Sequence, residues 1–170
     1  MSTLYSFPPI VAPSATTLVL GSMPGKASLD ANQYYAHPRN AFWKIMGELY
    51  GFSASDDYLT RVAALKRAHI ALWDVLRSCE RPGSLDSNIV ESTIIANDFP
   101  TFFKNHPSIE RVVFNGGKAE AAFKKYVLPN LTLKAKISFH RAPSTSPAHA
   151  ALSAEKKRDL WKQNLIGTAT

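Results

Sequence analysis

Residues 17–25 read TLVLGSMPG, an apolar run followed at once by a loop with a glycine at each end. The run Thr17–Leu20 is short and rich in branched side chains, which is typical of a strand buried in a parallel sheet. Such sheets hold ligands outside the carboxyl ends of their strands, so the loop should border a binding site. Glycine permits close backbone approach and proline stiffens the chain, which leaves backbone N–H groups free to face a ligand. The predicted ligand-contacting residues of this loop are Gly21, Ser22, Met23, Pro24 and Gly25.

Further strands and helices alternate along the chain. Strand-like apolar runs occur over 18–20, 70–73, 112–114 and 131–139, the last interrupted by lysines. Apolar residues with helical spacing occur over 42–49, 58–65 and 119–126. Helices are also expected over 88–103, where Pro100 would bend or divide the helix, and over 149–165. This alternation predicts an α/β fold, a three-layer α/β/α sandwich whose parallel sheet is covered on both faces.

Length and composition limit the class of protein. The 170 residues, 45% of them hydrophobic, fit one domain spanning 1–170. The sequence contains no apolar run of 18 residues and begins without the features of a secretory signal, so we expect a soluble, cytoplasmic protein that does not bind membranes. One cysteine, Cys79, excludes an internal disulfide and a cysteine-bound cluster. His37, His69 and His106 lack metal-ligand spacing, so no metal is predicted.

The positive charge is concentrated in one part of the chain. The net charge is +7, and residues 118–162 hold 10 of the 20 Lys and Arg but only 3 of the 13 acidic residues. This excess could meet the phosphates of a nucleic acid. The candidates are Lys134, Lys136, Arg141, Lys156, Lys157, Arg158 and Lys162. For 156–162 alone, a solvated basic helix is an equally good interpretation.

Six segments together resemble a known family. They are GSMPG (21–25), QYYAHPRNAFW (33–43), LWDVL (72–76), GSLDS (83–87), VVFNGGKA (112–119) and APSTSPAHA (142–150). In this order they resemble the uracil-DNA glycosylase superfamily and, within it, the hypoxanthine (deoxyinosine) DNA glycosylase branch. Residues 1–15 fall outside the resemblance as an N-terminal extension.

The resemblance implies a fold and an activity. The fold would have a central, mostly parallel sheet of four strands, with the active site at their carboxyl ends. The activity would be that of a DNA repair enzyme, a monofunctional DNA glycosylase that flips a deaminated base out of DNA and hydrolyses its N-glycosidic bond, leaving an abasic site. Hypoxanthine is the expected base, with uracil and xanthine as further candidates. The partner would be double- or single-stranded DNA, and the protein would act as a monomer without a cofactor.

Tyr34, Tyr35 and Asn40 are the residues expected to hold and act on the base. Aromatic faces can stack on a flipped base, and the resemblance puts the stacking ring at Tyr35. Either tyrosine could instead be a packing ring.

Asn40 is the predicted catalytic residue, because its oxygen can accept from a water and its NH₂ can donate to the base or sugar. An amide is too weak a base to abstract a proton, so bond breaking would run ahead of water attack. The alternative for Asn40 is an N-cap of a helix beginning at Ala41.

Two departures from better-known relatives support this choice. Other members resemble this chain around Met23 but have either a water-positioning Asn or an Asp at that position. A methionine side chain can take the role of neither residue. The resemblance places a histidine that donates to the base anion at Ala142, so that role is vacant unless His140 or His149 supplies it. The hypoxanthine branch shares both substitutions, and its functional asparagine matches Asn40.

Two further segments complete the predicted site. The resemblance maps Asn115 to a position that reads a base edge, and an amide can pair with O6 and N1–H of hypoxanthine. Its alternative is an N-cap of a helix starting near Lys118. The loop 143–149 is rich in hydroxyls and stiffened by proline, so it could bind phosphates or wedge into the duplex, or simply cap a helix through Ser144 or Ser146. The predicted DNA-contacting residues are Ser144, Thr145, Ser146, Pro147 and His149.

Several interpretations remain open at this stage. Asp74 and Asp86 lie near strand ends, and capping or bracing of loops is the expected role for each. His37 would brace the Asn40 loop. A nucleotide triphosphate site is disfavoured because three residues, not four, separate Gly21 from Gly25. The competing functions are a non-catalytic nucleic-acid-binding module and a small-molecule enzyme of the same architecture, and the second leaves the basic segment unexplained.

Overall fold

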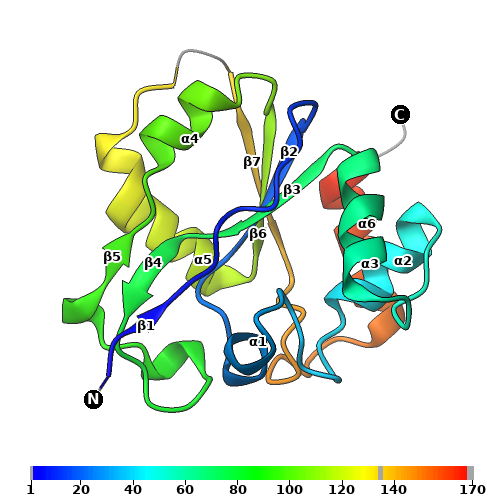
Figure 1. Ribbon diagram of the computed structural model, residues 1–170, viewed down its shortest axis with the longest axis horizontal. Helices are drawn as coiled ribbons and strands as arrows, with labels where there is room; N and C mark the ends of the chain where they lie inside the picture. Colours follow the sequence, from blue (N-terminus) through cyan, green and yellow to red (C-terminus); the bar gives the residue numbers. More distant parts are fainter. Residues whose placement is uncertain (1, 134–135, 168–170) are drawn as a thin grey trace.

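Four parallel strands form the centre of the molecule, in the order β3-β2-β6-β7 (Figure 1). The computed structural model describes residues 2–133 and 136–167. The strands are β2 (Thr17–Gly21), β3 (Ile70–Asp74), β6 (Arg111–Asn115) and β7 (Ser138–Ala142). Gly21 is in register with Asp74, and Asn115 with Ala142, so all four strands end at one edge of the sheet. The predicted four-stranded parallel sheet is therefore confirmed.

Helices cover both faces of this sheet, as the alternating pattern predicted. Figure 1 shows α4 and α5 on one side of the sheet and α2, α3 and α6 on the other. Along β2, Leu18 and Leu20 belong to the apolar core on the side of α4 and α5, whereas Val19 belongs to the core on the side of α2, α3 and α6. Successive side chains of a strand point to opposite faces, so a fully apolar strand supplies two cores at once. The helices are α1 (Lys26–Ala31), α2 (Phe42–Tyr50), α3 (Tyr58–Arg67), α4 (Phe99–Asn105), α5 (Gly117–Ala122) and α6 (Ala154–Ile166). The α/β/α sandwich is confirmed.

A second, smaller sheet joins the N-terminal residues to the domain. β1 (Leu4–Tyr5) and β5 (Ile95–Ala96) pair antiparallel with β4 (Leu76–Cys79). Ile10 also bridges to Leu72 of the central sheet. The segment before residue 15 is thus packed against the domain, which its sequence did not indicate.

Several element boundaries differ from those predicted. Pro100 lies in the first turn of α4, where its missing N–H costs nothing, so it begins a helix instead of bending one. The residues before it form short 3₁₀ turns at Asp86–Asn88 and Glu91–Thr93. The last helix, α6, is capped by Ser153 and begins at Ala154, five residues later than expected. After α5 the helical path continues as a π turn (Phe123–Val127) and a 3₁₀ turn (Leu128–Asn130).

The predicted strand over 131–139 is largely wrong. Residues 131–133, 136 and 137 are not extended strand, and only the last two predicted residues belong to β7, which continues to Ala142. Residues 134–135 lie outside the described residues. Within the described part of the chain, no helix is long and apolar enough to cross a membrane.

Candidate active site

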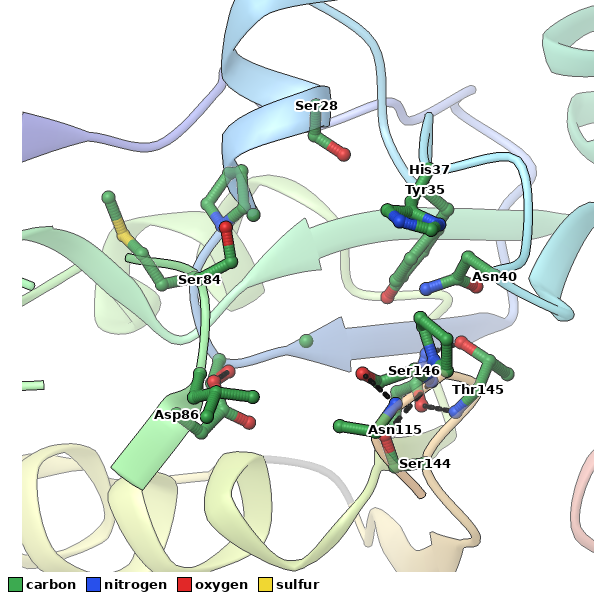
Figure 2. A pocket seen from close by; sticks show the side chains of 18 of the residues that line it. Ser28, Tyr35, His37, Asn40, Ser84, Asp86, Asn115, Ser144, Thr145 and Ser146 are labelled. Carbon is green, nitrogen blue, oxygen red and sulfur yellow. Dashed lines mark hydrogen bonds between the residues drawn. The ribbon is translucent and has the colours of Figure 1, made fainter. Parts of the chain in front are cut away.

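A cavity of about 460 Å³ opens at the carboxyl ends of the strands. Figure 2 shows that it is bordered by Ser84 and Asp86 on one side and by Asn40 and Ser146 on the other. From four separate segments it gathers the predicted catalytic and base-binding residues and the predicted DNA-contacting residues of the loop 143–149. They are Gly21, Ser22, Met23, Pro24, Gly25, Tyr35, Asn40, Asn115, Ser144, Thr145, Ser146, Pro147 and His149. Their proximity is thus shown, whereas their roles stay predictions.

Gly21 is required by close packing at the cavity floor. A Cβ atom added there would lie 2.5 Å from Oδ1 of Asp74 and 3.1 Å from the Tyr35 hydroxyl. Real Cβ atoms do not come within 2.5 Å of a carboxylate oxygen, so a side chain would displace two cavity-lining groups. The side chain of Met23 in the same loop is buried in the core on the α4 and α5 side. Met23 also lines the cavity, where its buried thioether can offer an apolar contact but no strong hydrogen bond.

The two adjacent tyrosines have different roles. Tyr34 is buried, and its hydroxyl donates to the carbonyl of Pro8 (2.9 Å), so it is a packing residue. Tyr35 stacks on buried Phe42 with ring centroids 4.2 Å apart and also lines the cavity. A ring supported on one face and open on the other is suited to hold a flat ligand. Tyr35 has a positive φ of 54°, which is uncommon for a bulky residue and is often found at functional sites.

Asn40 both binds the start of α2 and faces the cavity. Its Oδ1 accepts from the backbone N–H of Phe42 (3.0 Å), the first residue of α2, but the N-cap of this helix is Ala41. The N-cap interpretation of Asn40 is therefore wrong, although its oxygen does bind the start of the helix. Figure 2 shows its amide nitrogen directed into the cavity. Because the oxygen already accepts from Phe42 and the NH₂ group points into the cavity, the NH₂ group is the part best placed to contact a ligand. The structure thus favours a donor role over water positioning.

His37 provides a second donor near Asn40. Its Nδ1 accepts from the backbone N–H of Arg39 (3.0 Å), and the side chain lines the cavity. A neutral imidazole that accepts at Nδ1 carries its proton on Nε2, which is then a donor. Sequence reasoning gave His37 only a bracing role, because nothing in the HPRN motif shows which ring nitrogen is occupied.

Asn115 is tied to the opposite loop. Its Nδ2 donates to the Thr145 hydroxyl and its Oδ1 accepts from the Thr145 backbone N–H, both at 2.9 Å. It does not cap α5, whose N-cap is Gly116. Asn115 therefore positions the loop 143–149, and one N–H and one lone pair of its amide are left to read a base edge.

The loop 143–149 differs from the prediction at Thr145. Thr145 is 1% exposed and its hydroxyl is bound to Asn115, so this side chain fixes the loop and does not face a phosphate. Ser144 and Ser146 lie at the cavity edge, and each hydroxyl accepts a backbone N–H at 3.2 Å. Both retain their own hydrogen for donation to a phosphate oxygen. His149 lines the cavity, whereas His140 contacts Ser138 and is not among the described lining residues.

Some of the basic candidates already have partners. Lys157 is buried and donates to the His149 carbonyl, and Arg158 pairs with Glu48, Glu155 and Asp159. Arg141 lies 3.5 Å from Glu120 beside the loop 143–149. These three contribute more to structure than predicted. No salt bridge involves Lys136, Lys156 or Lys162 within the described residues, and Lys134 lies outside them.

Asp74 is the functional candidate whose environment the sequence did not reveal. It is 3% exposed at the end of β3, it lines the cavity, and its Oδ2 has no hydrogen-bond partner among the described residues. Burial, and then the charge of Asp86, raise the pKa of Asp74 to about 7, against an opposing effect of Arg81. The expected capping role is therefore wrong. Asp86 does brace a loop, because it accepts from the Ser22 hydroxyl at 2.6 Å.

This environment makes the stability of the protein depend on pH. The folded-state pKa of Asp74 lies above its ordinary 3.8. The contribution of Asp74 to the free energy of unfolding is therefore fully present below about pH 4 and is lost as the pH rises through 7. The free energy of unfolding should fall by up to about 1.4 kcal/mol per pH unit in this range because of this group. Urea unfolding of the wild type and Asp74→Asn between pH 4 and 8 measures the difference. Parallel pH profiles for the two proteins would contradict the assignment.

Comparisons with known proteins agree with the fold. Residues 8–167 match the family model for the uracil DNA glycosylase superfamily. Two proteins described as hypoxanthine DNA glycosylases, from Methanosarcina barkeri and Methanosarcina acetivorans, are 40% and 37% identical over 114 residues, which is 66% of this chain and 71% of each relative. The NMR solution structure of a candidate uracil DNA glycosylase from Methanosarcina acetivorans has a TM-score of 0.74 and 28% identity, covering 95% of this chain and 98% of that one.

Proposed function

Because this chain belongs to the uracil DNA glycosylase superfamily, we propose that it removes hypoxanthine from DNA by hydrolysing the N-glycosidic bond. The observation that carries the proposal is the cavity, where an aromatic shelf, two donors and a buried carboxyl meet at the ends of the strands. The two relatives described as hypoxanthine DNA glycosylases support the choice of base. A flipped nucleotide would enter this cavity, since its base cannot be reached inside the duplex.

The cavity suits a dissociative reaction. The glycosidic bond would break first, giving an oxocarbenium-like sugar and a base anion. The amide of Asn40 and Nε2–H of His37 are donors placed to stabilise that anion, in a site where donors need no reorganisation. Protonated Asp74 offers one donor and one acceptor, which match O6 and N1–H of hypoxanthine. Water would then attack the sugar.

The reaction should stop at the abasic site. A strand-cleaving glycosylase needs a free amine to form a Schiff base. Lys26 lines the cavity, but its ammonium group is 2.8 Å from Asp30, and this contact raises the pKa of Lys26. A lysine held in its charged form is a poor nucleophile. We accordingly propose a monofunctional enzyme, and one that acts as a monomer because a single chain forms the whole cavity.

Tyr35 should contribute to substrate affinity through its ring. Replacing Tyr35 with alanine removes a shelf that is worth roughly 1–3 kcal/mol per stacked base, so KM for an inosine duplex should rise about 5- to 150-fold. Tyr35→Phe keeps the ring and should stay near the wild type, since the Tyr35 hydroxyl has no partner among the described residues. Steady-state kinetics of both variants test this. An equal loss in Tyr35→Phe would assign the effect to the hydroxyl.

The proposal is tested by incubating the protein with labelled duplexes that contain one inosine, uracil or xanthine, followed by alkali. We expect scission at inosine that requires the alkali step. Scission before alkali would contradict the monofunctional mechanism. Binding without scission on every duplex would instead identify a non-catalytic module of the same fold.

A further inference from the structure

The segment 84–88 forms a rim of the cavity and is fastened to its floor. The hydroxyl of Ser84 accepts from the backbone N–H of Lys26 (2.9 Å), and Asp86 accepts from the hydroxyl of Ser22 (2.6 Å). Both partners belong to the segment that follows β2. Figure 2 shows Ser84 and Asp86 at this side of the cavity, and Leu85 lies between them in the chain. Leu85 therefore stands between two residues that are each held in place.

A buried arginine fixes the approach to this rim. Arg81 donates from Nε to the carbonyl of Gly83 (2.9 Å) and from Nη2 to the carbonyl of Pro24 (2.8 Å). Gly83 has a positive φ of 75°, which turns the chain sharply just before the rim. The rim is thus set by three separate attachments, and its side chains are presented in defined positions.

Leu85 is an unusual side chain for such a rim. It is 50% exposed, and among the exposed large apolar residues of the described ranges it alone lines the cavity. The opposite rim, 143–149, presents serines, alanine, proline and histidine but no large aliphatic side chain. Among the cavity-lining residues that the structure describes, the one large apolar side chain that is also exposed is therefore on the rim 84–88.

The charges of the two rims indicate which part of a DNA duplex each would meet. The rim 84–88 carries Asp86 and no lysine or arginine, so it would repel phosphates. The rim 143–149 lies beside Arg141 and offers hydroxyl donors from Ser144 and Ser146. The phosphate backbone is better accommodated on that side, which leaves the rim 84–88 facing the bases.

We propose that Leu85 enters the base stack and fills the space that the flipped nucleotide leaves. The inference rests on the proposed function and adds a residue to it. Extruding a base exposes the faces of its neighbours, and an inserted apolar side chain covers them again. The sequence suggested that the proline-stiffened loop 143–149 wedges into the duplex. In this proposal the inserted side chain comes from the rim 84–88 instead.

A comparison of single-stranded and duplex substrates tests this role. Leu85→Ala should lower the single-turnover excision rate of inosine paired with cytosine by about tenfold or more, because no side chain then replaces the flipped base. The same variant should excise inosine from the single strand within about twofold of the wild-type rate, since there is no stack to fill. Leu85→Met, which keeps an apolar chain of similar volume, should restore duplex excision.

The matched control is Leu59→Ala, which removes a 77% exposed leucine of α3 that does not line the cavity and should leave both rates unchanged. Equal losses on both substrates, no loss on the duplex, or a change in association state alone would overturn the role of Leu85. A wild-type protein that excises inosine from neither substrate would instead contradict the proposed function itself, so the two failures are distinguishable.

Discussion

Replacing Asn40 with alanine is expected to slow hypoxanthine excision by about 100- to 1,000-fold, the usual cost of losing a donor that stabilises a developing anion. The Asn40 amide nitrogen faces the cavity, whereas its oxygen is bound to the start of α2. Affinity for the inosine duplex should change little, because phosphate contacts and stacking dominate binding. Single-turnover kinetics of Asn40→Ala measure the excision rate, and a binding titration of the same variant measures its affinity for the inosine duplex.

Asn40→Asp separates the role of the amide nitrogen from that of the oxygen. Aspartate keeps an oxygen for the N–H of Phe42, so the contact at the start of α2 should remain and the variant should unfold at a similar urea concentration to the wild type. It lacks the NH₂ group, so its excision rate should be at least as low as that of Asn40→Ala. An active Asn40→Asp variant would show that the oxygen, and not the amide nitrogen, takes part in the reaction.

The second large effect concerns pH. Because the pKa of Asp74 is raised to about 7, its carboxyl is mostly neutral below that pH and mostly ionised above it. An ionised Asp74 would place a negative charge beside the departing base anion in a shielded cavity, and it could no longer donate to O6. The excision rate should therefore fall above about pH 7, by up to about tenfold per pH unit.

Two variants make this prediction specific to Asp74. Asp74→Asn stays neutral, so its rate should not show the fall. Asp86→Asn keeps an acceptor for the Ser22 hydroxyl but removes a charge that raises the pKa of Asp74, so the fall should begin at a lower pH. Single-turnover rates from pH 5 to 9 measure all three profiles. A fall that persists unchanged in Asp74→Asn would assign it to another group.

That the site residues lie close together could be predicted, because it follows from their positions at the ends of parallel strands. Gly21 and Asn115 directly end apolar runs, and the carboxyl ends of parallel strands meet at one edge of a sheet. Helical spacing over 42–49 and 58–65 likewise identified α2 and α3, whose apolar faces are regular.

The properties that were missed depend on contacts between distant residues. Whether Asp74 has a hydrogen-bond partner, or whether Thr145 is held by Asn115, is decided by side chains that lie far apart in the sequence. The short helix α1 lacks a side-chain cap and lies in a segment that reads as a loop. Apolar spacing and capping residues could not have shown any of these features.

The proposed reaction depends on the amide nitrogen of Asn40 reaching the flipped base. A crystal structure of the protein with a duplex that contains a non-hydrolysable deoxyinosine analogue tests this directly. We expect the base to lie on Tyr35, with Nδ2 of Asn40 roughly 2.7–3.2 Å from a base acceptor and Oδ1 still bound to Phe42. A base that lies away from Tyr35, or an Asn40 that turns its oxygen toward a water, would contradict the account.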